Sequence, residues 1–173
     1  MCEKYRTLST FFKNPHVNHK KVVFKKRYGI RLCGDLYTPE KMKDKLPAIA
    51  VCGPYEAVKE QCSGLYAQTP AERGFIPLAF DQFFSSESGG QPRYLSYGEI
   101  YTEDNSAAVD YLLLLSEVEK ESIGILGICG FGAIYVNSAV QDTRIKATVS
   151  CTMGAFDPEK WRRRIGVEPT ADR

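Results

Sequence analysis

Four short strand-like runs, separated by longer segments, limit the folds that are open to this chain. They cover residues 47–52, 75–80, 122–128 and 145–150, and runs of this length fit strands better than core helices. The first of them is continuously apolar, which is typical of a strand covered on both faces. The segments between them, 57–73, 102–116 and the stretch that ends near 141, are long enough for helices. This alternation predicts an α/β three-layer sandwich, with a mainly parallel sheet and helices on both faces.

Two more strand-like runs, residues 21–27 and 30–37, come before this pattern. They are joined through Tyr28 and Gly29, and glycine readily takes the positive φ that a tight hairpin requires. We therefore expect an antiparallel hairpin at the start of the sheet. The chain would then divide into an N-terminal arm (1–20), a domain (21–156) and a polar tail (157–173). Pro70 falls inside the expected helix 57–73, where it either costs about 3 kcal/mol or ends the helix early.

The composition excludes several classes of protein. The 173 residues are 43% apolar, as in one soluble globular domain, and 23 basic against 21 acidic residues give a net charge of only +2. This charge argues against nucleic acid or an anionic membrane as a partner. No apolar stretch approaches the roughly 20 residues of a membrane span, and no apolar segment follows the N-terminal charges as in a secretory signal. We expect a cytoplasmic protein.

Six cysteines without a C-x-x-C pair favour reduced thiols over a disulfide framework. Only two histidines are present, His16 and His19, so a zinc site of mixed ligands has little support. We expect no metal and no cofactor.

The most informative local feature is the turn around Cys129, between a buried strand and an apolar helix. Gly127 precedes the cysteine, and Gly130 and Gly132 follow it. A strand that enters a helix through a very tight turn exposes the residue at its apex and needs small neighbours. The helix N-terminus would stabilise a Cys129 thiolate, and the N–H of Gly130 would point toward an oxyanion.

Two other interpretations of this turn stay open on local sequence alone. The glycines could serve close packing only, with Cys129 as a buried apolar residue. The helix N-terminus could instead bind an anion or a nucleotide. Against a nucleotide, the glycines do not form G-x-G-x-x-G, and no acidic residue closes the following strand to hold a ribose.

Eight longer segments, called family words below, follow one another along the chain in the order found in a known family. They are Tyr28–Tyr37, Gly53–Tyr55, Ala57–Gln61, Gly64–Gln68, Ala79–Asp81, Glu87–Arg93, Leu126–Gly130 and Asp142–Thr148. Through these segments, residues 21 to about 153 resemble bacterial α/β-hydrolases of the dienelactone-hydrolase-like group, and the resemblance implies a truncation at the C-terminus. The resemblance implies a partial α/β-hydrolase fold and hydrolysis of small esters, lactones or related acyl compounds.

The same resemblance assigns roles to three residues. Cys129 is the nucleophile, and the backbone N–H groups of Gly130 and Tyr55 form the oxyanion hole; Pro54 has no N–H to give. Glu56 occupies a position at which the resembled family carries a glycine. The glutamate would put a charge and a stiffer backbone beside this site.

Other positions differ from the family or have simpler accounts. The tight turn around Cys129 corresponds to the nucleophile elbow of the family. Phe131 replaces the small residue of the general elbow pattern, and Cys52 replaces a usual histidine. Lys59, Glu60 and Gln61 match a family word, and the simplest account of them is a solvated first helical turn in which Glu60 favours the helix dipole. Asp142 lies between a helix and a strand and is expected to be structural.

A nucleophile of this fold works with an acid and a histidine that follow it in the chain. No histidine follows Cys129, and His16 and His19 precede the first expected strand, as solvated residues of the arm. The last strand would also form an open sheet edge, through which two chains could associate. Three hypotheses therefore remain: an acyl hydrolase, an inactive remnant or interaction module, and a reactive thiol activated by the helix N-terminus alone.

Overall fold

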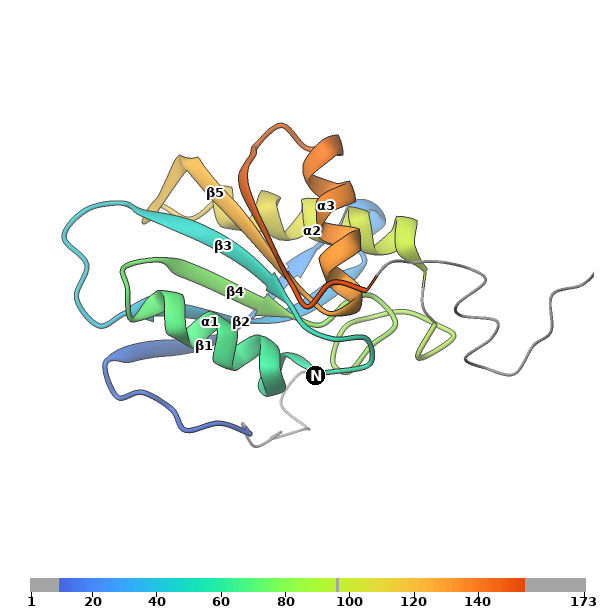
Figure 1. Cartoon of the computed structure of the whole chain (residues 1–173), viewed down its shortest axis with the longest axis horizontal. Coiled ribbons are helices and arrows are strands. Elements are labelled where there is room, and N and C mark those ends of the chain that lie inside the picture. Colours follow the sequence, from blue (N-terminus) through green and yellow to red (C-terminus); the bar gives the residue numbers. More distant parts are fainter. Residues whose placement is uncertain (1–9, 96, 155–173) are drawn as a thin grey trace, which may run out of the picture.

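One six-stranded sheet organises the computed structural model, which describes residues 10–95 and 97–154 (Figure 1). The strand order is β1-β2-β4-β3-β5-β6. Strand β2 is antiparallel to both β1 and β4, and the other neighbouring strands are parallel. This confirms the predicted mainly parallel sheet that begins with an antiparallel hairpin. The strands are β1 Val17–Lys25, β2 Arg31–Pro39, β3 Leu46–Cys52, β4 Ile76–Phe80, β5 Val118–Ile128 and β6 Ile145–Cys151.

Helices cover both faces of the sheet, so the predicted three layers are present (Figure 1). Neighbouring residues of a strand point to opposite faces. On β3, Ala50 packs in the cluster that holds α2 and α3, while Val51 packs in the cluster that holds α1. The two clusters explain why the central strands are apolar without alternation. The helical elements are η1 Arg27–Gly29, η2 Lys59–Ser63, α1 Gly64–Ala71, α2 Gly98–Leu113 and α3 Gly130–Gln141.

The first strand begins earlier than predicted. Strand β1 pairs with β2 over its whole length, from Val17 opposite Pro39 to Lys25 opposite Arg31. The strand thus begins within the stretch expected to be the arm, and His19 belongs to the strand. The predicted hairpin turn is present, with positive φ at both of its central residues, Tyr28 (62°) and Gly29 (74°).

Three predicted boundaries also shift. The expected helix 57–73 is divided into the short π-helical segment η2 and the helix α1, which ends at Ala71, one residue after Pro70. Pro70 thus lies inside the last turn of the helix, and the chain leaves the helix through Gly74, which has a positive φ of 87°. Helix α2 begins at Gly98 instead of 102, and β5 begins at Val118 instead of 122, because Val118 is fully buried opposite Leu46.

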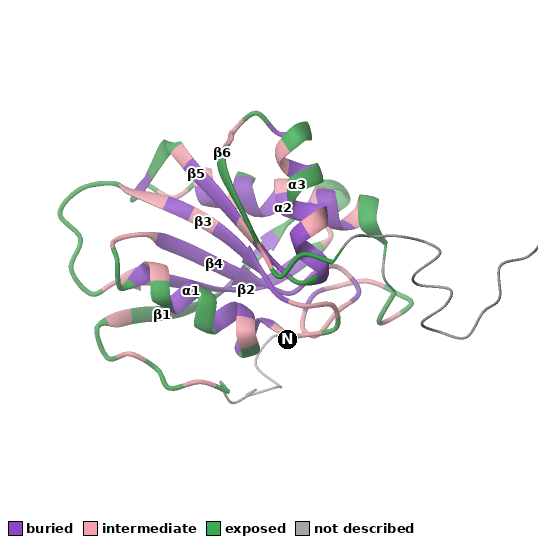
Figure 2. Cartoon of the chain, viewed as in Figure 1, coloured by how far each residue is buried: buried purple, intermediate pink, exposed green. Residues whose placement is uncertain are grey.

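Strand β6 forms one edge of the sheet and is exposed along most of its length (Figure 2). Within the described ranges, no strand pairs with its outer side, and Val149 is 53% exposed. Association of two chains through this edge stays a prediction. The tail 157–173 lies outside the described residues. Among the helices of residues 10–95 and 97–154, none is long and apolar enough to cross a bilayer.

Candidate active site

Cys129 is the single residue between the end of β5 and the start of α3. Its backbone has φ 57° and ψ −118°, and the residue is exposed. A non-glycine residue in such a conformation costs about 1–3 kcal/mol, so its surroundings must hold it. They do so through both of its backbone groups: the N–H donates to the Cys151 carbonyl (2.8 Å), and the carbonyl accepts from the Gly132 N–H (3.0 Å). The interpretation of Cys129 as a buried packing residue is therefore wrong.

Close backbone approach explains the glycines that flank the cysteine. A Cβ added at Gly127 would lie 2.4 Å from the carbonyl oxygen of Phe131, so the backbone itself would have to shift. A Cβ added at Gly132 would lie 2.5 Å from the hydroxyl oxygen of Ser150 on β6. The turn can enter the helix this tightly only because both positions lack a side chain.

The two residues expected to stabilise an oxyanion, Gly130 and Tyr55, are neighbours in space. A Cβ added at Gly130 would lie 1.9 Å from a ring carbon of Tyr55. The Tyr55 ring also lies 5.2 Å from the ring of Phe131 and 6.3 Å from that of Tyr101, measured between centroids. The bulky Phe131, which departs from the usual elbow pattern, thus helps to fix the loop after β3 against the start of α3.

The backbone of this loop has a second left-handed position at Glu56, with φ 64°. A glycine would take this conformation at no steric cost, which accounts physically for the glycine that the family word carries there. The Glu56 side chain is exposed, so its charge is solvated at the rim of the loop.

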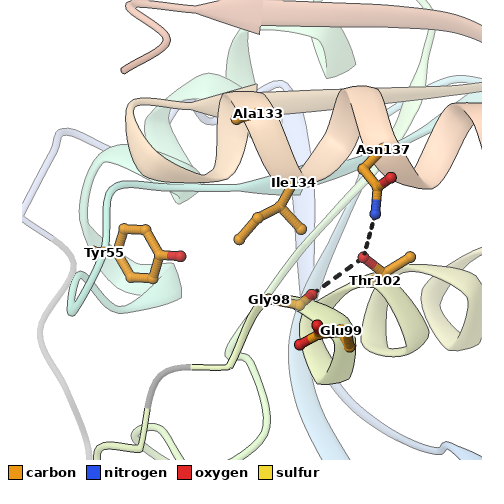
Figure 3. Close-up of a pocket in the computed structure, with 7 residues that line it drawn as sticks. All are labelled: Tyr55, Gly98, Glu99, Thr102, Ala133, Ile134 and Asn137. Carbon is orange, nitrogen blue, oxygen red and sulfur yellow. Dashed lines mark hydrogen bonds between the residues drawn. The ribbon is translucent and has the colours of Figure 1, made fainter. Parts of the chain in front are cut away.

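A cleft of about 450 Å³ opens between this loop and the helices α2 and α3 (Figure 3). Its apolar wall consists of Tyr55, Ala133 and Ile134. On the polar side, the Thr102 hydroxyl donates to the Gly98 carbonyl (3.1 Å) and accepts from the Asn137 amide (3.4 Å). Because Tyr55 lies against Gly130, the cleft begins beside the elbow.

Beneath the loop lies a buried ion cluster. Lys59 is fully buried, and its ammonium donates to Glu60 (2.7 Å), Asp81 (2.8 Å) and Glu87 (2.7 Å). The Lys59 backbone N–H also donates to Asp81 (2.9 Å), and Lys21 donates to Glu87 (2.6 Å). The prediction that Lys59 and Glu60 lie in a solvated helical turn is therefore wrong. Both residues are buried, and three carboxylates share the Lys59 ammonium inside the protein.

The charges of this cluster stabilise one another. Burial acts to lower the pKa of Lys59, but Asp81, Glu60 and Glu87 outweigh it and raise that pKa. Burial also opposes ionisation of Glu87, yet hydrogen bonds from Lys21 and Lys59 lower its pKa. The cluster ties the loop after β3 to the end of β4 and to the loop before α2. Sequence reasoning missed this role, although Lys59, Asp81 and Glu87 each stood in a separate family word.

Neither histidine of the chain lies at the elbow. The side chain of His16 is 79% exposed, and His19 lies 3.3 Å from Asp35 on β2. Strand β1 is four strand spacings away from β5, roughly 19 Å. Asp142 binds the Arg144 guanidinium (2.8 Å) between α3 and β6, in the structural position that was predicted.

Other thiols and acids near the site do not form a metal centre. Burial raises the pKa of the Cys52 thiol to about 12, and Gln82 donates to its sulfur (2.7 Å). Among the described residues, no group of three or more histidines, cysteines and carboxylates is arranged to hold a metal ion.

Comparison with known proteins places this arrangement in a family. A family model described as X-Pro dipeptidyl-peptidase (S15 family) matches residues 28–170. The uncharacterized protein PA2218 of Pseudomonas aeruginosa is 55% identical over 145 residues, which are 83% of this chain and 39% of that protein. Its crystal structure superposes with a TM-score of 0.82 at 54% identity, covering 84% of this chain and 46% of the other.

Two further relatives are more distant. The uncharacterized protein YcjY of Escherichia coli is 41% identical over 79% of this chain and 46% of its own length. Thiohydrolase aneE of Aspergillus aculeatus is 30% identical over 79% of this chain and 42% of its own length. The chain thus spans less than half of the length of these three curated relatives.

Proposed function

The chain belongs to the X-Pro dipeptidyl-peptidase (S15) family of α/β-hydrolases, and on this premise we propose that Cys129 is the nucleophile of an acyl hydrolase. The observation that carries the proposal is the exposed cysteine between β5 and α3, held at φ 57°. Esters and thioesters are the proposed substrates. A relative named as a thiohydrolase supports the inclusion of thioesters.

The proposed first step is attack of the Cys129 sulfur on the carbonyl carbon. The electron pair of the C=O bond moves to the oxygen, and the N–H groups of Gly130 and Tyr55 donate hydrogen bonds to the resulting oxyanion. The attacking sulfur belongs to the residue that directly precedes α3. Collapse of the intermediate expels the alkoxide or thiolate and leaves an acyl group on Cys129. In this proposal the cleft beside Tyr55 receives the acyl chain.

The position of the histidines limits which substrates react. An alkoxide of high pKa needs a general acid to leave, and His16 and His19 are too distant to act as one. A phenolate or a thiolate of low pKa leaves without a proton. We therefore propose that this chain is acylated by activated esters and thioesters and that the acyl-enzyme hydrolyses slowly, since neither His16 nor His19 is near enough to activate water.

A burst experiment tests this function. The protein is mixed with p-nitrophenyl acetate, and the release of nitrophenolate is followed together with the intact mass. The expected result is a burst of about one nitrophenolate per chain and one acetyl group on Cys129. Cys129→Ala should abolish both, whereas the matched control Cys62→Ala, which removes another partly exposed thiol, should keep both.

Two results would contradict the proposal. Equal release by the wild type and Cys129→Ala would place the reaction elsewhere. A folded wild type without an acetyl adduct would instead favour the inactive remnant.

A further inference from the structure

A second thiol lies next to Cys129 on the neighbouring strand. Cys151 ends β6, and its carbonyl accepts a 2.8 Å hydrogen bond from the Cys129 N–H. Neighbouring strands lie about 4.8 Å apart, and a disulfide needs a Cα separation of roughly 4.4–6.8 Å. Cys151 lies opposite Ile128, one residue before Cys129, and this offset of about 3.3 Å along the strand puts the Cα atoms of the two cysteines roughly 6 Å apart, within the range of a disulfide.

The side chain of Cys151 is accessible and lies on the side of α1. Its sulfur is 3.8 Å from the hydroxyl of Tyr66, and the residue is partly exposed. A third thiol, Cys62 in η2, interacts with both of the others: burial chiefly raises its pKa, and Cys151 and Cys129 raise it further. Three thiols thus gather around the elbow.

We propose that Cys129 and Cys151 form an oxidation site for hydroperoxides, in which Cys129 is oxidised first and Cys151 then closes a disulfide with it. This inference goes beyond the acyl chemistry and does not depend on it. Cys129 is exposed at the start of α3, and the Cys151 thiol belongs to the residue whose carbonyl accepts from its N–H.

The chemistry balances without a further co-reactant. The Cys129 thiolate attacks one oxygen of hydrogen peroxide, which leaves a sulfenic acid and hydroxide. The Cys151 thiolate attacks the sulfenic sulfur and displaces a second hydroxide, forming the S–S bond. The two hydroxides take up the two thiol protons as water, and two electrons pass from the thiols to the peroxide.

The other cysteines of the described ranges are less suited to either role. Cys33 and Cys52 are 1% and 3% exposed, so peroxide does not reach them readily. Cys62 keeps its proton to higher pH because of its raised pKa, and a thiol is a poorer nucleophile than a thiolate. Cys151 is therefore the residue expected to attack the sulfenic acid.

Peptide mapping of the peroxide-treated full chain tests the proposal. The expected result is the loss of two thiols per chain and a cross-linked peptide that joins Cys129 to Cys151, both reversed by a dithiol reductant. In Cys151→Ser the cross-link should disappear, and Cys129 should progress to the sulfinic acid. The matched control Cys62→Ser should form the same disulfide as the wild type.

Several outcomes would overturn the proposal. They are a cross-link from Cys129 to Cys62, disulfides only between chains, and a Cys129 that stays reduced in folded protein. Circular dichroism before and after treatment establishes that the protein is folded, and Cys151→Ala provides a second variant should the serine disturb β6. The mapping needs no ester substrate, so its result is independent of the burst experiment.

Discussion

Substitution of Lys59 by methionine tests whether the buried ion cluster holds the loop after β3. Methionine keeps most of the length and apolar volume of the side chain but removes its charge. Three carboxylates, those of Glu60, Asp81 and Glu87, then lose the ammonium that lies 2.7–2.8 Å from each of them.

The loss of stability in Lys59→Met depends on the burial of the ion pairs more than on the distances between their atoms. Removing one partner of a buried ion pair costs about 3–5 kcal/mol, because the other charge is left without compensation. In a chain of this size about 1 kcal/mol shifts Tm by roughly 2–4 °C, so Lys59→Met should lower Tm by about 6–20 °C. The matched control is Lys21→Met. Lys21 contacts the same oxygen of Glu87 at 2.6 Å, but its side chain is 35% exposed, and exposed pairs contribute about 0.2–1 kcal/mol.

Urea unfolding followed by circular dichroism gives the free energy of unfolding of each variant. The difference in the free energy of unfolding between the wild type and Lys59→Met should become smaller in acid. Glu87 has a lowered pKa in the folded protein, so its contribution is present above its ordinary value of 4.5 and is lost as the pH falls through the lower folded value. Equal costs for Lys59→Met and Lys21→Met would refute the reasoning, since distance alone would then explain both.

Two more predictions concern a buried carboxyl group and the elbow. Burial raises the pKa of Asp104 from 3.8 to about 6 against the opposing charge of Lys26, so its stabilising effect is present below pH 3.8 and is lost as the pH rises through 6, a loss of about 3 kcal/mol. Urea unfolding across this range should show this fall in the free energy of unfolding in the wild type and not in Asp104→Asn. The same fall in both proteins would contradict the raised pKa of Asp104. Gly127→Ala, whose Cβ meets the Phe131 carbonyl oxygen at 2.4 Å, should cost about 1–3 kcal/mol in thermal melts. Gly98→Ala, with no atom within 4 Å of its Cβ, should change stability by less than about 1 kcal/mol, and similar effects of the two substitutions would be inconsistent with the packing described.

The fold could be predicted from the sequence because its signals are local. The apolar runs lie on the strands β3 to β6, and the glycines around Cys129 mark a tight turn that can be recognised without coordinates. The start of β1 was missed because it is an edge strand, where exposed polar residues such as Asn18 and Lys20 carry no alternation. The finer assignment to dienelactone-hydrolase-like enzymes stays a prediction, as do the nucleophilic role of Cys129 and the cytoplasmic location.

The ion cluster could not be predicted for a different physical reason. Lys59 is 22 residues from Asp81 and 28 from Glu87 along the chain, and nothing local distinguishes a buried lysine from a solvated one. Only the topology, which places the loop after β3 beside the end of β4, brings these charges together. A sequence pattern can locate a turn, but it cannot show which charges that turn meets.

The amide of Cys129 links the turn before α3 to the edge of the sheet, since it donates its hydrogen bond to the Cys151 carbonyl on β6. Detachment of β6 would free that amide and let the strained backbone at position 129 relax. Hydrogen exchange of the Cys129 amide should therefore report the detachment of β6, and the same motion would change the backbone conformation that positions the sulfur.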